Sequence, residues 1–117
     1  MTPTRNRGEV WVANLNPRFG TEPGKSRPVL IIQAQGLLDA EHPSTLVVPL
    51  TTRLSQGSEI LRLRLKAGGG LRHDSDLLTD QIRAIDNERF TDGPLLRLDD
   101  DFMARIDDAI RKVLDLL

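Results

Sequence analysis

Short apolar runs broken by glycine and proline predict a chain built mostly of β-strands. The first run covers 8–15 and ends at Asn16-Pro17, because proline cannot continue a hydrogen-bonded ladder. Continuous aliphatic and β-branched runs at 28–32 and 45–50 are typical of strands that are buried on both faces. We therefore expect three strands here, the last two in the core.

The segments around these runs are polar and carry positive charge. Residues 18–26 contain two glycines and one proline and predict a loop longer than a hairpin needs, and long loops often carry function. From 59 to 66, apolar and basic residues alternate, so a strand there would place Arg62, Arg64 and Lys66 on one face. That face would be positively charged.

The C-terminal half predicts one more strand and a helix. Three glycines at 68–70 turn the chain into a strand over 76–84, with Leu78, Asp80 and Ile82 on one face. Asp99 is a suitable N-cap, and apolar residues recur at helical spacing from 102 to 117. Five short strands and a terminal amphipathic helix indicate a small, strongly curved, barrel-like sheet covered by the helix.

The composition narrows the class of protein. A chain of 117 residues is long enough for a single domain, 1–117, but too short for two cores. The absence of cysteine excludes disulfides and cysteine-based zinc or thiolate sites, which favours a reducing, cytoplasmic location. Neither a secretory signal nor an apolar run long enough for a bilayer is present, so we expect no membrane association.

The net charge of −1 hides an uneven distribution. Residues 1–36 and 53–73 carry net charges of +3 and +4, whereas 37–52 and 74–117 carry −2 and −6. A basic face opposite an acidic face is therefore one outcome of folding, and interleaved charges are the other. The first outcome would allow a nucleic-acid partner despite the acidic total.

Several sequence blocks, in order and covering nearly the whole chain, carry a family resemblance. They are RGEVW at 7–11, NP at 16–17, GTEPGKSRPVLIIQ at 20–33, VPLTT at 48–52 and DQIRAID at 80–86. Together they resemble the MazF/PemK toxins of type II toxin-antitoxin systems, also called mRNA interferases.

The resemblance implies a fold, an activity and partners. The fold would be an SH3-like small barrel of the CcdB/PemK type with a C-terminal amphipathic helix, assembled as a homodimer. The activity would be sequence-specific, metal-independent endoribonuclease cleavage of single-stranded RNA, by attack of a 2'-hydroxyl on the adjacent phosphate. A MazE-like antitoxin with a disordered acidic segment would neutralise it, and DNA would be contacted only through the antitoxin complex.

Matching the family motifs residue by residue gives the candidate catalytic residues. Arg27 matches a catalytic arginine, and its guanidinium suits two phosphate oxygens. Thr51 matches an active-site position whose hydroxyl suits the charge of the phosphorane. Glu22 and Asp80 compete for the general base. Leu78 departs from the PemK branch, in which an arginine at that position supplies the acid.

The same residues also have purely structural interpretations. Arg27 would otherwise be expected in an ion pair with Glu22 or Asp80, and Thr51 in an ordinary turn. For RNA binding, we expect basic side chains to contact phosphates and side-chain amides to contact bases. Trp11 and Phe19 are the candidates for stacking on bases, although the position of Trp11 in a strand is more typical of a core residue. The RNA-binding candidates are Asn16, Lys25, Arg53, Arg62, Arg64, Gln81 and Arg83.

No metal or other cofactor is expected, because His42 and His73 lie in separate loops and the segment from His73 to Asp76 is typical of a polar turn. Three alternatives to a ribonuclease remain at this stage. They are a CcdB-like gyrase poison, a non-enzymatic SH3-like binding module for proline-rich peptides, and a catalytically inactive family member. The single tryptophan at position 11 and the absence of tyrosine count against the first two.

Overall fold

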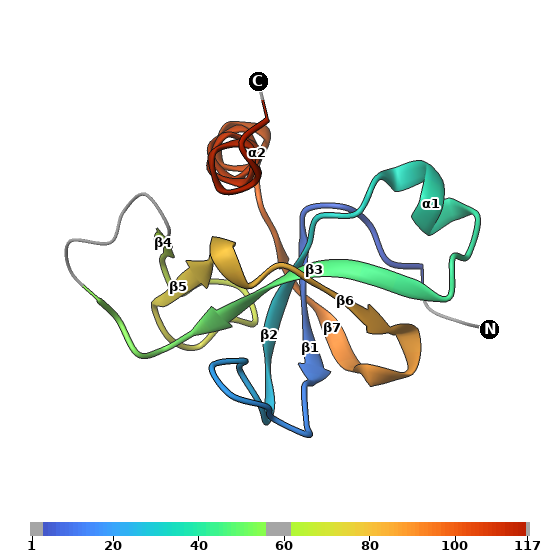
Figure 1. The fold of residues 1–117 in the computed structure, drawn as a ribbon, viewed down its shortest axis with the longest axis horizontal. Coiled ribbons are helices and arrows are strands. Elements are labelled where there is room, and N and C mark those ends of the chain that lie inside the picture. Colours follow the sequence, from blue (N-terminus) through green and yellow to red (C-terminus); the bar gives the residue numbers. More distant parts are fainter. Residues whose placement is uncertain (1–3, 56–61, 117) are drawn as a thin grey trace.

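The computed structural model describes residues 4–55 and 62–116, and three predicted strands form its centre. They are β1 (Glu9–Asn14), β2 (Ser26–Ile31) and β3 (Ser44–Thr51). Each pairs antiparallel with the next, with Val10 opposite Leu30 and Leu30 opposite Val48 (Figure 1). The hydrophobic runs therefore predict the three central strands within one or two residues at each end.

The strand predicted over 76–84 is wrong as a continuous element. It consists of β5 (Ser75–Leu78), a 3-10 turn η1 (Thr79–Gln81) and β6 (Arg83–Asp86). Both strands pair antiparallel with β3, β6 with its first half and β5 with its last residues. Because the turn interrupts the alternation, Leu78, Asp80 and Ile82 do not share a strand face.

Pro49 gives the physical reason for this interruption. It lies in β3 between the residues that pair with β6, up to Val47, and those that pair with β5, from Leu50. Proline has no N–H group to donate to a ladder, so the chain can leave β3 at this point without breaking a hydrogen bond. The three residues of η1 occupy this gap.

The two ends of the sheet are β4 (Arg62–Leu65) and β7 (Phe90–Arg97). The order of strands is β4-β5-β3-β2-β1-β7, with β6 beside β3. The predicted alternating strand over 59–66 is confirmed from residue 62, and 59–61 lie outside the described residues. β7 was not predicted, because its Gly93-Pro94 pair is typical of a turn, and the edge position tolerates the proline.

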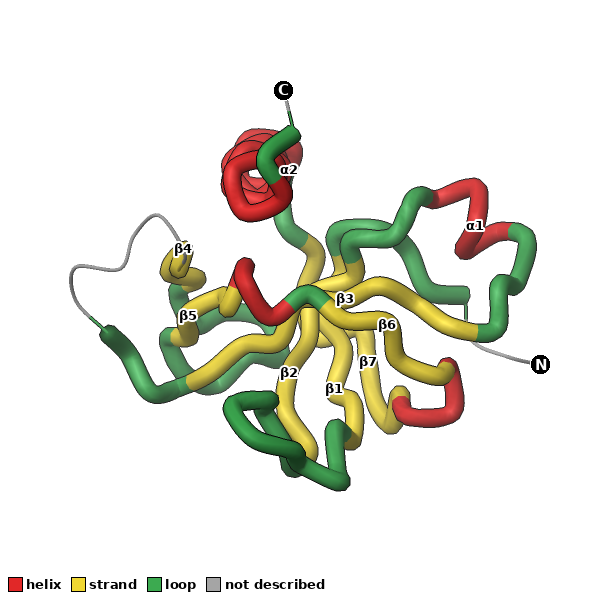
Figure 2. Tube along the Cα trace, viewed as in Figure 1, coloured by secondary structure: helices red, strands yellow, loops and turns green. Residues whose placement is uncertain are grey.

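Helices lie on either side of the sheet, as Figure 2 shows in red. The predicted C-terminal helix is α2 (Asp100–Leu114), whose first turn is capped by the Asp99 carboxylate, which accepts a hydrogen bond from the Phe102 N–H at 2.7 Å. It ends earlier than predicted, because Asp115 adopts a left-handed conformation (φ +57°). The short helices α1 (Gln35–Asp39) and η2 (Asn87–Arg89) were not predicted.

Two clusters of buried side chains lie on opposite faces of the central strands. Alternating residues separate them, so that Val10 and Leu30 belong to one and Trp11 and Val29 to the other. The first cluster includes Met103 and Ile106 of α2, and the second packs against Leu38 of α1 and Phe90. Both faces of β2 and β3 are therefore buried, as the continuous hydrophobic runs predict.

Gly93 of β7 lies against the indole of Trp11 and gives the first testable prediction. A Cβ atom there would come within 2.4 Å of a Trp11 ring carbon, and the backbone has φ +151°, which side chains rarely adopt. We expect Gly93→Ala to lower the free energy of unfolding by about 2–3 kcal/mol in urea denaturation. Gly36→Ala in α1 is the control, since open space surrounds it and alanine favours helix. Equal stability of the two variants would contradict this packing.

Candidate active site

The site begins with the pairing of β2 and β3. Val29 lies opposite Pro49 and Ile31 opposite Val47. Beyond this ladder, the Arg27 Nη1 donates to the carbonyl of Leu50, the residue before Thr51, at 3.3 Å. The sequence-predicted pair therefore lies on neighbouring strands. Both side chains line the same pocket, together with residues of the β1–β2 loop.

Backbone carbonyl groups fix the Arg27 guanidinium. Its Nε donates to the Gly24 carbonyl at 2.9 Å and its Nη1 to the Leu50 carbonyl at 3.3 Å. The salt bridges of residues 4–55 and 62–116 do not include Arg27, so the expected ion pair with Glu22 or Asp80 is not found. Its other N–H bonds are therefore available to an incoming anion.

Partial burial affects the charge of this group. Desolvation, and secondly the positive charge of Arg18, lower the pKa of Arg27 below its ordinary value. An arginine ordinarily loses its proton only far above neutral pH, so the guanidinium remains positive at neutral pH although its pKa is lowered. A cation held partly out of water without a carboxylate partner favours binding of an anion.

The Thr51 hydroxyl takes part in a turn, as its structural interpretation predicts. Its Oγ1 accepts a hydrogen bond from the Arg53 N–H at 3.1 Å, which fixes the side chain as the chain leaves β3. An oxygen that accepts this bond keeps its own proton for donation. Turn formation and donation to a developing anionic charge are therefore compatible.

The pocket has a volume of about 510 Å³ and contains six of the predicted residues. Arg27, Thr51 and Glu22 supply possible chemistry, and the others are cations that point to phosphate binding. The sequence analysis missed Arg18 and Ser75, which follow from no motif. Together, the six predicted residues and these two line the pocket with Arg18, Glu22, Lys25, Arg27, Thr51, Arg53, Arg62 and Ser75.

Hydrogen bonds fix the loop that forms one wall of this pocket. The Asn16 Oδ1 accepts from the Lys25 N–H at 2.8 Å, and the Leu15 N–H donates to the Lys25 carbonyl at 2.9 Å. Arg89 donates to the Asn14 carbonyl at 3.0 Å from the far side. Asn16, predicted to contact bases, therefore uses its side-chain oxygen to shape the loop, and only its amide N–H groups remain for a ligand.

Five predicted residues do not line the pocket: Asn16, Arg64, Asp80, Gln81 and Arg83. Asp80 is exposed and Gln81 half-buried in η1, which contacts α2 and β3. Arg83 lies in β6 opposite Val47. Within one copy of the chain, Asp80 therefore lies outside the lining of the pocket that Arg27 and Glu22 share.

Comparison with known proteins identifies the family. The family model of the PemK-like, MazF-like toxin of type II toxin-antitoxin system matches residues 6–114. This chain belongs to that family. The match spans nearly every strand and helix described above, including both walls of the pocket.

Individual relatives agree with this assignment. The chain is 35% identical over 112 residues to the endoribonuclease EndoA of Bacillus subtilis (strain 168), covering 95% of each protein. Its fold is that of MazF from Deinococcus radiodurans, with a TM-score of 0.82 at 21% identity over 98% of this chain and 100% of that one. The Mycobacterium tuberculosis toxin MazF-mt6 has a TM-score of 0.76 at 21% identity over 93% and 98%.

The assignment confirms the predicted CcdB/PemK-type fold and bears on two of the three alternatives. The family model of PemK-like and MazF-like toxins matches the chain. This match does not favour a gyrase poison or an SH3-like adaptor. Among residues 4–55 and 62–116, no cluster of three or more histidine, aspartate or glutamate side chains is placed to hold a metal ion. In the same residues, no helix has the length and apolar character to cross a membrane.

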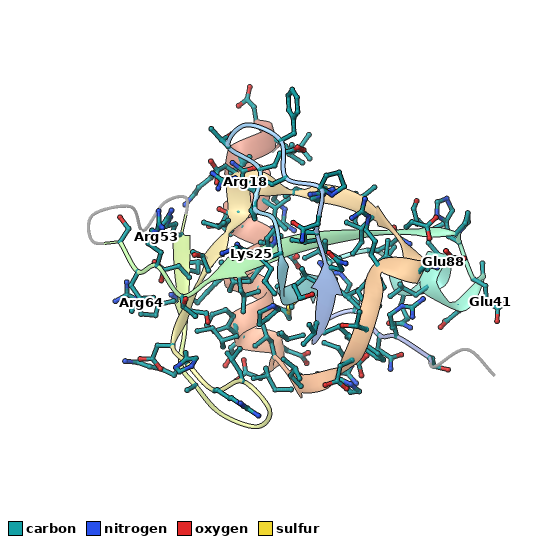
Figure 3. The ribbon with its side chains drawn as sticks, turned by 90° about the horizontal axis from the view of Figure 1, so that it is seen from below. Arg18, Lys25, Glu41, Arg53, Arg64 and Glu88 are labelled. Carbon is teal, nitrogen blue, oxygen red and sulfur yellow. The ribbon has the colours of Figure 1, made fainter. Side chains whose placement is uncertain are left out.

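Charged side chains are distributed unevenly in this MazF-like chain, although the ion pairs of Arg64 with Asp76 and of Lys66 with Asp74 also place acidic groups among the basic ones. Figure 3 shows Arg18, Lys25, Arg53 and Arg64 toward one end of the molecule, with Glu41 and Glu88 at the other. The acidic end has its own pocket of about 680 Å³, lined by Asp39, Glu41 and Glu88 together with Arg5 and His42. The pocket at the basic end holds the catalytic candidates Arg27 and Thr51 together with the cations Arg18, Lys25, Arg53 and Arg62.

Lys25 gives a prediction about the pocket wall. Its backbone is left-handed (φ +61°), a conformation that costs an L-residue about 1–2 kcal/mol and glycine almost nothing. We expect Lys25→Gly to be about 1 kcal/mol more stable than Lys25→Ala, after allowing for the larger unfolded-state entropy of glycine. Urea denaturation of both variants measures the difference. A more stable alanine variant would show that the loop does not adopt this conformation.

Proposed function

We propose that this chain is the toxin of a toxin-antitoxin pair and acts as a sequence-specific, metal-independent endoribonuclease on single-stranded RNA, with messenger RNA as the expected target. The carrying observation is the juxtaposition of Arg27 and Thr51 in one basic pocket, within a chain of the PemK-like, MazF-like family. The name of EndoA, an endoribonuclease related over 95% of its length, supports the activity.

The proposed reaction is an internal transesterification. The 2'-hydroxyl attacks the adjacent phosphorus, its proton passes to a general base, and a P–O2' bond forms. The P–O5' bond then breaks and the leaving oxygen takes up a proton. The products are a 2',3'-cyclic phosphate and a 5'-hydroxyl end, which balances atoms and charge without a metal or an attacking water.

Arg27 and Thr51 would stabilise the charge that develops on the phosphorane. The guanidinium is already fixed by the Gly24 and Leu50 carbonyl groups, so it needs little reorganisation when the charge appears. The Thr51 hydroxyl is fixed by the Arg53 N–H and donates its proton toward the same oxygens. Arg27 is also proposed to protonate the leaving 5'-oxygen, or to stabilise its negative charge until it takes up a proton.

We assign the general base to Glu22 rather than Asp80. Glu22 is half-buried in the same pocket as Arg27 and Thr51, whereas Asp80 is exposed outside the lining of that pocket. A base must come within hydrogen-bond reach of the proton it removes, so location in the pocket is the first criterion. Asp80 remains the candidate only if a second copy of the chain rearranges this region.

RNA binding would use the cations of the lining. Lys25, Arg53 and Arg62 are placed for phosphate contacts, and Lys25 keeps a strained backbone conformation at this position. Phe19, 81% exposed in the same loop, is the stacking candidate, whereas Trp11 is 4% exposed and belongs to the core. Arg64, Gln81, Arg83 and the Asn16 amide would contact only more distant nucleotides.

The proposed partners follow from the family. Relatives of known structure include an endoribonuclease in complex with its cognate antitoxin and a MazE-MazF complex from Deinococcus radiodurans. A MazE-like antitoxin with an acidic segment would complement the basic pocket of this chain. We further propose a homodimer that acts in the cytoplasm, where its RNA substrate is present, with DNA contacted only through the antitoxin complex.

Replacing Arg27 tests the carrying observation. We expect Arg27→Ala to lower kcat for a single-stranded RNA in EDTA by about 10²- to 10³-fold, as for other donors to an oxyanion, with an unchanged fold by circular dichroism. Arg72→Ala removes an exposed arginine outside the pocket and is the matched control. Folded Arg27→Ala protein that cleaves at the wild-type rate would refute the proposed mechanism.

The choice of base is tested by two isosteric variants. Glu22→Gln is expected to lose at least about 10²-fold in kcat, because general-base catalysis contributes a factor of this size. Asp80→Asn should retain activity close to that of the wild type. The reverse pattern would move the assignment to Asp80, and small, equal losses would mean that neither carboxylate is the base.

A further inference from the structure

Asp76, which the sequence analysis placed in a polar turn, is instead a buried carboxylate of β5 next to the pocket-lining Ser75. Asp76 of β5 is 1% exposed, the only acidic residue buried so completely among residues 4–55 and 62–116. In the sheet it lies opposite Thr51 of β3 on one side and Arg64 of β4 on the other. It therefore neighbours the catalytic candidate Thr51 without lining the pocket itself.

Three groups converge on this carboxylate. The Arg64 Nε donates to Oδ1 at 3.0 Å, the Ser55 N–H donates to Oδ2 at 3.0 Å, and the Arg62 Nη1 lies 3.8 Å from Oδ2. Burial alone would raise the pKa of Asp76, but the Arg64 and Ser55 hydrogen bonds and the nearby positive charges outweigh it and hold the pKa below its usual value. Asp76 is therefore an anion at neutral pH.

The two arginines extend this arrangement to the segment that follows Thr51. The Arg64 Nη2 donates to the Ser55 carbonyl and the Arg62 Nη1 to the Arg53 carbonyl, each at 3.1 Å. Both backbone groups of Ser55 are thus fixed by Asp76 and its partner. A buried carboxylate is costly unless it is paired, so it strongly favours the conformation in which all these contacts form together.

We propose that Asp76 is a positioning residue of the RNA-cleaving site, where its carboxylate fixes Arg62, Arg64 and the 53–55 backbone so that Arg53 and Arg62 face the pocket before RNA binds. This rests on the proposed function. Arg53 and Arg62 are the pocket cations on the β3–β4 side, opposite those of the β1–β2 loop. A preformed wall lowers the entropy lost when a flexible RNA strand binds.

The direction in which RNA affinity changes distinguishes a positioning role of Asp76 from a purely electrostatic effect of its charge. Replacing Asp76 by the isosteric asparagine removes one negative charge beside a basic pocket, so long-range electrostatics alone predicts tighter RNA binding. Loss of positioning predicts weaker binding from the same substitution. The two accounts therefore give opposite results in one measurement.

The experiment compares Asp76→Asn with Asp74→Asn in the full chain. Asp74 is the matched control, since it carries the same charge two residues away and pairs with Lys66 at 3.7 Å outside the pocket. Affinity is read from the fluorescence anisotropy of a labelled single-stranded RNA made uncleavable by 2'-deoxy substitution, and KM and kcat from cleavage of the unmodified RNA. We expect Asp76→Asn to weaken binding and raise KM about tenfold, with a smaller change in kcat.

Asp74→Asn should bind equally well or slightly more tightly than the wild type. Binding by folded Asp76→Asn that matches or exceeds that of Asp74→Asn would overturn the positioning role. A wild-type chain that neither binds nor cleaves RNA would overturn the proposed function and this proposal with it. Active wild type with an unaffected variant would overturn the positioning role alone.

A second variant keeps the test decisive if Asp76→Asn does not fold. Arg64→Lys changes a side chain that is 38% exposed and keeps its charge, but a lysine cannot reach Asp76 and the Ser55 carbonyl at once. Positioning predicts about three- to fivefold weaker RNA binding. Unchanged binding would contradict it, because an arginine that served only as a positive charge would be replaced by lysine without loss.

Discussion

The pairing of β2 with β3 is the constraint on which the other features depend. Val29, Leu30 and Ile31 are fully buried and lie opposite Pro49, Val48 and Val47, so a shift by one residue would exchange the two hydrophobic faces of the sheet. One face carries α2 and the other carries α1 and Phe90. The same two strands bring Arg27 and Thr51 to one pocket. Core packing thus fixes the geometry of the candidate active site at the end of these strands.

The sequence predicted the strands and the helix that depend on residues close together in the chain. A short apolar run predicted β1, continuous hydrophobic runs predicted β2 and β3, and the Asp99 cap with helical spacing predicted the start of α2. The division of the 76–84 strand could not be predicted, because it depends on Pro49 in a strand far away in sequence. β7 was missed because an edge strand tolerates Gly93 and Pro94, which otherwise indicate a turn. Tertiary partners, rather than propensity, determine these elements.

The candidate site divides in the same way. Arg27, Thr51 and Glu22 followed from motifs, and the structure brings them into one pocket with Lys25, Arg53 and Arg62. Asp76 was missed because its partners, Ser55 and the arginines of β4, are distant from it in sequence. Asn16 was expected to face RNA although its side-chain oxygen accepts a hydrogen bond within the loop. A net charge near zero also conceals the cations Arg53 and Arg64 at one end of the molecule, since Glu41 and Glu88 lie at the other end (Figure 3). Local charge, not the total, therefore governs which ligand each end can bind.

The central claim is that this site cleaves RNA through the neighbouring 2'-hydroxyl. The most direct measurement maps the ends of fragments produced in EDTA, and then repeats the digestion with an RNA carrying one 2'-deoxynucleotide immediately 5' of a mapped cut. The account predicts 5'-hydroxyl and 2',3'-cyclic phosphate ends in the first digestion and loss of that one cut in the second, with the other cuts unchanged. Continued cleavage at the deoxy position, or fragments with 5'-phosphate ends, would contradict it, because water would then be the nucleophile.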